Sequence, residues 1–276
     1  MNKQIIMLGM VTVACLSVIS TGAFPGNKKN QDFIVRHYML SGGLQYGIGA
    51  PLSNSYSNPL DIRFRYSHNT NTYLRLNISR MSLFAGLRFT SFQFNRHLLN
   101  QDIRLRYEQQ GYKVSEEVLG SSFDIITPYF GFAYVFRYKS LRLEPLIRFG
   151  LGISNYAIAP VYLTPDQSGK PSRTVYFIDS RPNLFVNNSL GINVSKRLSN
   201  FIKFNVTAGL DLGNPGKAEI IEETNEASFY TIRKRNLYLQ HNATQFYLMA
   251  GFEFTPFNKI YADEKRYERL RSNMKN

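Results

Sequence analysis

The chain has 276 residues, enough for one large domain or two small ones. Apolar residues make up 43% and aromatic residues 14%, which excludes a disordered chain, and a single cysteine excludes a disulfide framework and a cysteine-rich metal site. The formal net charge is +14. Beyond the N-terminal segment there is no apolar run of roughly 18 residues, so the sequence offers no second membrane-spanning helix.

Residues 1–23 have the features of a secretory signal. Lys3 supplies the positive start, residues 5–19 are mostly apolar, and Thr21-Gly22-Ala23 offers small residues for cleavage. We therefore predict that residues 24–37 begin the mature chain as a periplasmic segment. Two alternatives remain: an uncleaved anchor, for which about 15 apolar residues are short, and lipidation of the single cysteine. Loss of Lys3 would leave a mature charge of 14 − 1 = +13.

The body of the chain alternates apolar and polar residues with a period of two, which is typical of strands with two different faces. In residues 38–50, even positions are apolar and odd positions are small or polar. The polar run 67–72 interrupts the second segment and is compatible with a turn inside a hairpin. We find no competing helical period before residue 258. The eight predicted strands are 38–50, 61–78, 81–94, 123–138, 141–158, 184–197, 201–212 and 244–257.

The connections between these segments alternate in length. The tight turns are 79–80, 139–140 and 198–200, and the long loops are 51–60, 95–122, 159–183 and 213–243. Short turns at one rim and long loops at the other predict an all-β fold, an eight-stranded antiparallel up-and-down transmembrane β-barrel with its termini in the periplasm. The alternative is a soluble barrel with its polar face in water. Two features favour the membrane: the polar face is rich in Gly, Ser, Asn and Thr, and the strands exceed the usual ~5–6 residues.

Two of the long loops contain extended patterns of their own. Residues 103–107 and 113–114 flank Gln110-Gly111, which predicts a hairpin. Residues 229–232 and 237–239 also have the composition of strands. The barrel wall is therefore expected to continue beyond the bilayer.

Many charged residues fall on the predicted inner face of the barrel. Because buried charges are costly unless paired, and eight strands leave little room inside, we predict a salt-bridged plug and no open pore. The alternative is a gated ion path through an arginine–carboxylate switch. The predicted interior residues are Arg63, Arg65, Arg75, Arg88, Arg137, Arg142, Glu144, Arg148, Lys203, Asp211 and Glu253.

No catalytic, cofactor or metal motif emerges. The four histidines, His37, His68, His97 and His241, share no metal-ligand spacing. No phosphate-binding loop and no nucleophile elbow is present. We therefore predict a protein that is not an enzyme and needs no cofactor. A lipid A-modifying enzyme that uses His37 and His241 remains the alternative.

The positive charge points to anionic lipid head groups and not to nucleic acid, because export removes that partner. Phosphates of lipopolysaccharide at the outer rim are the predicted ligands of these loop residues: Arg104, Arg106, Lys113, Arg233, Lys234 and Arg235. Residues 258–276 change to a charged pattern that predicts a short periplasmic helix or a frayed tail. Contact of this tail with a periplasmic partner is the functional alternative.

The glycine-rich first strand Ser41-Gly42-Gly43-Leu44-Gln45-Tyr46-Gly47 and the aromatic last strand Gly251-Phe252-Glu253-Phe254 carry a resemblance. Residues 38–257 resemble the small bacterial outer-membrane β-barrel proteins that include the PorT-like family, although the chain continues past the usual aromatic end. The resemblance implies an outer-membrane location and insertion by the barrel-assembly machinery. Members of the PorT-like family are tied to protein secretion through the outer membrane. We predict a structural, interaction or secretion-accessory role through the extracellular loops and the periplasmic tail, with envelope or secretion proteins as partners.

Overall fold

The computed structural model describes a barrel and the structure at one end of it. Residues 1–37 and 256–276, where the sequence predicts the signal, the periplasmic segment and the charged tail, lie outside the described residues. No helix among the described residues is long and apolar enough to cross a membrane. The described ranges are 38–52, 63–78, 80–115, 121–138, 141–158, 160–166, 171–179, 182–199, 201–226 and 232–255.

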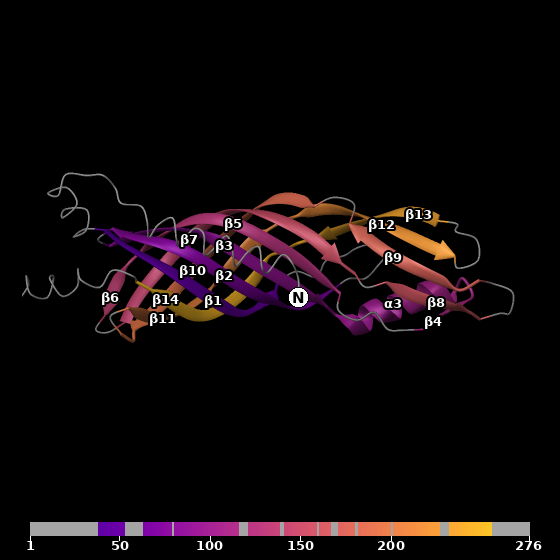
Figure 1. The fold of residues 1–276 in the computed structure, drawn as a ribbon, viewed down its shortest axis with the longest axis horizontal. Helices are drawn as coiled ribbons and strands as arrows, with labels where there is room; N and C mark the ends of the chain where they lie inside the picture. The colour runs from indigo at the N-terminus through magenta and orange to yellow at the C-terminus, as the bar shows by residue number, and fades with distance from the viewer. Residues whose placement is uncertain are drawn as a thin grey trace, which may run out of the picture.

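Eight long strands close into the barrel (Figure 1). They are β1 (Tyr38–Pro51), β2 (Phe64–Ile78), β3 (Met81–Phe94), β5 (Ser122–Tyr134), β7 (Leu141–Ala157), β10 (Asn183–Arg197), β11 (Ile202–Gly213) and β14 (Gln245–Phe254). Each strand pairs antiparallel with the next, β10 pairs with β7, and β14 pairs with β1. The short strand β6 (Phe136–Tyr138) continues β5 along β7. The predicted eight-stranded antiparallel barrel is confirmed.

The polar run in the second segment is part of a continuous strand. β2 runs through residues 67–72 with unbroken pairing to β1. Ser67, Asn69 and Asn71 are fully buried, because they point into the lumen where other polar groups meet them. The alternative of a turn inside a hairpin is therefore wrong.

The outer face of the barrel is apolar. Leu44, Ile48 and Leu184 have exposed fractions of 53%, 58% and 69%, whereas inward neighbours such as Gln45 are buried. This arrangement is the reverse of a soluble barrel, and exposed apolar bands with closed strand pairing suit the hydrocarbon core of a membrane. The barrel therefore spans the bacterial outer membrane, where proteins of this architecture reside.

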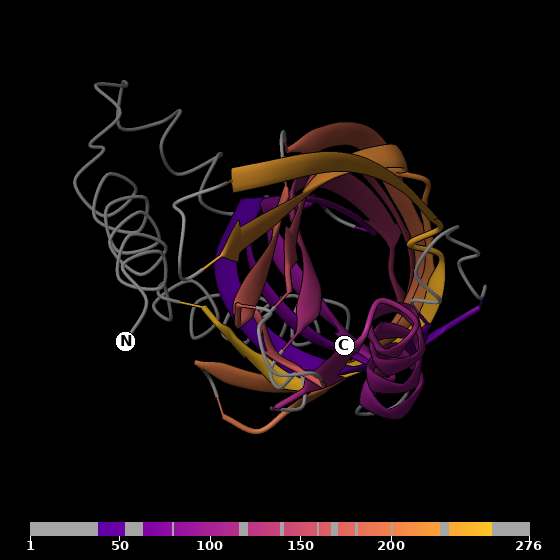
Figure 2. The same ribbon diagram turned by 90° about the vertical axis from the view of Figure 1, so that its right-hand side faces the viewer.

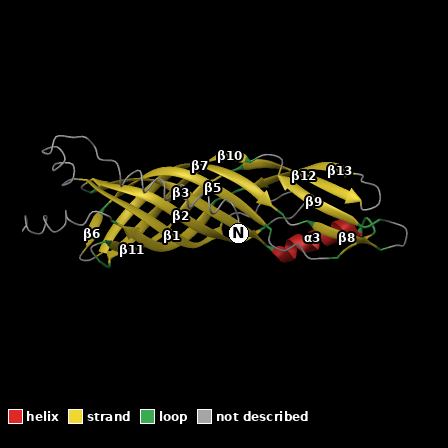
Figure 3. Cartoon of the chain, in the orientation of Figure 1, coloured by secondary structure: helices red, strands yellow, loops and turns green. Residues whose placement is uncertain are grey.

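The long connections form a second unit at one end of the barrel, which we call the outer module (Figures 1 and 3). It contains α3 (Arg96–Glu108), β4 (Tyr112–Val114), β8 (Val161–Pro165), β9 (Arg173–Asp179), β12 (Gly216–Glu226) and β13 (Ile232–His241). Its five strands form a sheet in the order β13-β12-β9-β8-β4. In bacterial outer-membrane barrels the end with long loops faces the outside of the cell.

Helix α3 replaces the hairpin that the sequence predicts at 103–107 and 113–114. Ile103 and Tyr107 fit a period of two, but they are also spaced by four, and Leu99 extends that spacing by another turn. All three side chains are buried on one face of the helix, so burial selects the helical period. Gly111 then takes a positive φ of 79° and leads the chain into β4.

The second extended loop is predicted correctly where the structure describes it. The expected strand residues 237–239 lie in β13, which pairs antiparallel with β12. Of the other expected stretch, Ile232 begins β13, and residues 229–231 lie outside the described residues.

One apolar core joins the outer module to the barrel. Leu99 and Ile103 of α3 belong to the same buried cluster as Phe92 and Phe123, which point inward at the outer end of the barrel wall. Phe123 also contacts Tyr156 of β7, with ring centroids 4.5 Å apart. The core therefore fixes the module on the barrel mouth, and Figure 2 shows α3 at the rim of the ring of strands.

Small residues inside the barrel let its walls come close together. A Cβ atom on Gly47 would lie 1.9 Å from the backbone oxygen of Leu248 on the neighbouring strand. On Gly209 it would lie 2.5 Å from the hydroxyl of Tyr247, whose ring occupies that space. Glycine at these positions is required by close approach.

We predict that Gly47→Ala impairs folding of the barrel, because the added methyl group meets backbone that cannot rotate away. A cost of roughly 1–3 kcal/mol in unfolding free energy is expected for such overpacking. The measurement is the fraction of heat-modifiable, folded protein after refolding into detergent. Ala50→Val on the outer face of the same strand is the control and should fold normally. Equal folding of both variants would contradict this packing.

Candidate functional site

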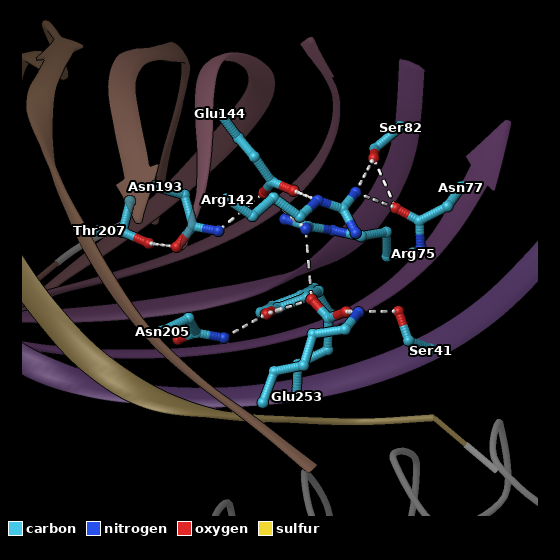
Figure 4. A network of polar contacts seen from close by, with 12 residues as sticks. Ser41, Arg75, Asn77, Ser82, Arg142, Glu144, Asn193, Asn205, Thr207 and Glu253 are labelled. Atoms are coloured by element: carbon cyan, nitrogen blue, oxygen red, sulfur yellow. Dashed lines mark hydrogen bonds and ion pairs between the residues drawn. The ribbon is translucent and has the colours of Figure 1, made fainter. Parts of the chain in front are cut away.

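The lumen contains a cluster of ion pairs near the end with short turns (Figure 4). Arg75 of β2 lies between two carboxylates, with Nη1 2.7 Å from Glu144 Oε2 and 3.3 Å from Glu253 Oε2. Arg142 also pairs with Glu144, and Lys203 Nζ lies 2.6 Å from Glu253 Oε1. Four strands (β2, β7, β11 and β14) contribute these residues because each has an inward residue at this level. We call this set the lower network.

Neutral polar side chains complete the lower network. Asn193 donates to Glu144 at 2.8 Å, and Ser41 donates to Glu253 at 3.0 Å. The Tyr73 hydroxyl donates to the other oxygen of Glu253 at 3.3 Å and accepts from Asn205 at 2.9 Å. Both carboxylates thus have cationic and neutral donors, which buried carboxylates need to offset desolvation.

A second set of residues, the upper network, lies further toward the outer module. Arg88 Nη1 lies 2.6 Å from Asp211 Oδ1, and Gln245 donates to Asp211 Oδ2 at 2.8 Å. Arg88 also donates to Asn69 at 2.9 Å and lies over the ring of Tyr247, 4.1 Å from its centroid. This arginine therefore combines an ion pair with a cation–π contact.

Arg148 is buried among aromatic rings and forms no ion pair with a described carboxylate. Its guanidinium carbon lies 5.3 Å from the ring centroid of Tyr129 and 5.8 Å from that of Phe84. Its Nη1 atom donates to the Tyr247 hydroxyl at 3.3 Å. The two networks and Arg148 together contain five cationic side chains and three carboxylates. These residues therefore carry a net charge of 5 − 3 = +2.

The structure brings together eight of the predicted interior residues. They are Arg75, Arg88, Arg142, Glu144, Arg148, Lys203, Asp211 and Glu253. The backbone of Arg137 lies in β6, and its side chain is outside the described part of the structure. Arg63 is half-buried and directly precedes β2.

Arg65 is not an interior residue, contrary to the prediction. A β-bulge shifts the pairing of β2 with β3 between Phe64 and Tyr66. The bulge reverses the alternation, so that Phe64 is buried while Arg65 and Tyr66 both face outward. The sequence alternation gives no sign of this inserted residue.

The side chains fill the lumen. The cavity lined by Tyr73, Arg75, Tyr129 and Arg148 has a volume of about 10 Å³. A space of this size is at the lower limit for a single water molecule. The apolar core lies at the barrel mouth, beyond the two networks. The ion pairs of the two networks join β2 to β7 and β14, and β3 to β11, across the lumen.

The sequence analysis missed the neutral partners of these charges. Gln45, for example, is 2% exposed, donates to Asn205 and Thr207, and accepts from Asn71. All of these residues occupy positions in their strands that alternate toward the lumen, and this alternation is the feature of the sequence that could have identified them. Hydrogen-bond pairing across the lumen depends on strand order and register, which alternation does not give.

The histidines that have described side chains do not point into the lumen. His68 faces outward from β2, with Nδ1 2.8 Å from the Tyr46 hydroxyl, and His97 is exposed on α3. His37 and the side chain of His241 lie outside the described residues. In the described portion there is no group of three or more His, Cys, Asp or Glu suited to a metal ion.

Two of the cations predicted to contact lipid already have partners inside the outer module. Arg106 Nη2 lies 2.6 Å from Glu222 Oε2. Lys113 Nζ lies 2.5 Å from Asp166 Oδ1, and this hydrogen bond raises the pKa of Lys113. Arg104 is exposed on α3. The side chains of Arg233, Lys234 and Arg235 are not among those described, although their backbone lies in β13.

Similar solved structures are outer-membrane proteins. No protein-family profile and no curated protein matches the chain. A major outer membrane protein from Thermus thermophilus is 9% identical with a TM-score of 0.44, covering 79% of this chain and 98% of its own. Neisserial surface protein A is 10% identical with a TM-score of 0.38, and the match covers 79% of this chain and 96% of that protein. The outer membrane protease OmpT from Escherichia coli is 10% identical with a TM-score of 0.37, covering 79% and 95%.

We predict that Glu144→Gln strongly destabilises the barrel. Glu144 is fully buried, and its loss as an anion leaves Arg142 without its carboxylate. Breaking a buried pair on one side costs about 3–5 kcal/mol. The measurement is the urea concentration at the midpoint of unfolding in detergent, with circular dichroism as the signal that monitors unfolding. Asp166→Asn, which breaks the exposed pair with Lys113, should have little effect. If the two variants matched in stability, the lumen carboxylate would not be anionic.

For the upper network we predict strong coupling between Arg88 and Asp211. Arg88→Met leaves a buried carboxylate, and Asp211→Leu leaves a buried guanidinium, so each single variant should lose about 3–5 kcal/mol. The double variant removes both charges. It should regain at least half of the unfolding free energy that the less stable single variant loses. The same unfolding assay closes the double-mutant cycle. Strictly additive losses would show that the two side chains do not form an ion pair in the folded barrel.

Proposed function

We propose that this protein is a non-enzymatic, non-conducting outer-membrane barrel that presents the outer module to a partner in the cell envelope. The observation that carries the proposal is the continuous apolar core from the barrel mouth into α3 and the second sheet. A core of this kind fixes the module in one orientation. A fixed surface lowers the entropy that must be lost when a partner binds.

The filled lumen supports a role outside the barrel. The charged side chains that could line an ion path are engaged with one another in the two networks. A gated channel would need several of these buried pairs to separate at once. Each separation exposes uncompensated charge and costs several kcal/mol.

The outer module offers surfaces of the kind that bind other proteins. Among the described residues, β13 pairs with β12 alone, so one edge of a ten-residue strand is open. Open strand edges can accept a strand from a partner. β13 also carries the sequence Arg233-Lys234-Arg235, which suits an acidic partner.

The resemblance of the first and last strands to the PorT-like family suggests a finer role, that of an accessory to protein secretion. A sealed barrel is compatible with it, because an accessory contributes a docking surface and leaves the passage to another protein. In this role, the partners of the outer module are secretion or envelope proteins.

The sealed lumen predicts that the purified protein produces no channel conductance in planar lipid bilayers. We expect no stepwise current above the baseline at any applied voltage that the bilayer tolerates. A known porin, inserted by the same procedure, is the control for successful fusion. Reproducible single-channel steps from the pure protein would contradict the proposal and favour a gated channel.

We also predict that excision of the β12–β13 hairpin removes the partner but leaves the barrel. Ala243 N donates to Gly213 O at 2.9 Å, so the ends of residues 214–242 lie together and a short turn can replace the hairpin. The native protein and this variant would be extracted in mild detergent, and the co-purifying proteins would be compared by mass spectrometry. Envelope proteins recovered with the native chain should be absent from the variant.

Two results would count against this proposal. Identical sets of co-purifying proteins, with the variant shown to be folded by heat modifiability, would remove the hairpin from the binding surface. A changed lipid A profile on deletion of the whole protein would favour the lipid A-modifying enzyme instead.

A further inference from the structure

A groove lies on the outside of the barrel, between α3 and the outer ends of β2 and β3. Its volume is about 730 Å³, within the range of sites that hold a small molecule. Cationic and amide side chains dominate its lining, and Glu108 is its one carboxylate among the described residues. The main lining residues are Arg65, Tyr66, Gln93, Arg96, His97 and Arg104.

Two local features of the chain create this groove. The β-bulge in β2 turns Arg65 out of the lumen and places it beside Tyr66 on the outer face. In α3, Leu99 and Ile103 are buried in the core, whereas Arg96 in the first turn and Arg104 are exposed and line the groove. The bulge and the helix thus direct three guanidinium groups into one space.

The groove lies directly beyond the apolar band of the barrel. Along the outer face of β3, Leu87 and Phe89 are followed by Ser91 and Gln93. Ser91 donates to Asp124 of the neighbouring strand at 2.6 Å, which marks the start of a polar surface. Because Gln93 lines the groove, the groove lies where the outer face of β3 changes from apolar to polar, and head groups are expected at such a boundary.

The charges in the groove suit a phosphate ligand. Arg65 and Arg96 form no ion pair with any described residue, in contrast to Arg75, Arg88 and Arg142 in the lumen. A guanidinium group binds phosphate through two parallel hydrogen bonds. Amide and hydroxyl groups of Gln93 and Tyr66 lie beside them and can bind the hydroxyl groups of a sugar.

We propose that this groove binds the phosphate-bearing sugar head group of a glycolipid in the surrounding outer leaflet. The lipid chains would lie against the apolar band below, and the phosphate would contact Arg65 and Arg96. This inference goes beyond the function proposed above, since it needs the membrane position of the barrel but no protein partner. Each proposal can therefore fail without the other.

The test uses the full mature chain in phosphatidylcholine nanodiscs. Bis-phosphorylated lipid A is titrated into the nanodiscs, and bound lipid is counted by native mass spectrometry. The variant Arg65→Gln/Arg96→Gln should bind at least about 10-fold more weakly than the native chain, because each lost phosphate contact is worth a factor of that order. The control variant, Arg80→Gln/Lys196→Gln, removes two exposed cations at the opposite end of the barrel and should bind normally.

Lipid A without phosphates should bind the native chain as weakly as bis-phosphorylated lipid A binds the groove variant. Equal affinity of the groove and control variants would overturn the site, and equal binding of phosphate-free lipid A would overturn the phosphate assignment. Inorganic phosphate is the third probe. If millimolar phosphate displaced the lipid completely, the groove would be a site for a soluble anion and not for a membrane lipid.

Discussion

The fold depends on the pairing of charges inside a lumen that is too narrow for water to solvate them. Glu144 is fully buried, and it is tolerated there because Arg75, Arg142 and Asn193 surround it. Arg142 shares β7 with Glu144, but Arg75 and Asn193 come from β2 and β10, so the full network forms only when the barrel has closed in the correct register. The outer face needs no such specificity, since lipid accepts any apolar side chain.

Both proposed binding surfaces lie at the outer end of the barrel, beyond the side chains that occupy the lumen. The apolar core that contains Phe92, Phe123 and Ile103 closes the barrel mouth and also supports the outer module. The same core thus packs the barrel mouth and orders the long connections, which would otherwise be free loops. The proposed protein surface on β13 and the proposed lipid groove beside α3 both depend on this core.

The sequence predicts the strands well, because a barrel in a membrane requires strict alternation over long segments. It predicts which charges face inward for the same reason. It fails for Arg65, because one inserted residue in a β-bulge reverses alternation without changing composition. It fails for α3, because Ile103 and Tyr107 satisfy both a strand and a helix period, and only packing against Phe92 and Phe123 separates them. Contacts between strands, such as Arg88 with Asp211, require a register that one sequence does not contain.

The most direct test of the central claim is the access of water-soluble reagents to the lumen. The only native cysteine, Cys15, lies in the predicted signal, so Thr207→Cys and Ser115→Cys each introduce one defined thiol. Thr207 is 1% exposed in the lumen, whereas Ser115 is exposed in the outer module. With a charged methanethiosulfonate reagent, we expect rapid modification at position 115 and none at position 207 until the protein is unfolded. Rapid modification at both positions in the folded protein would show an open lumen and contradict the account.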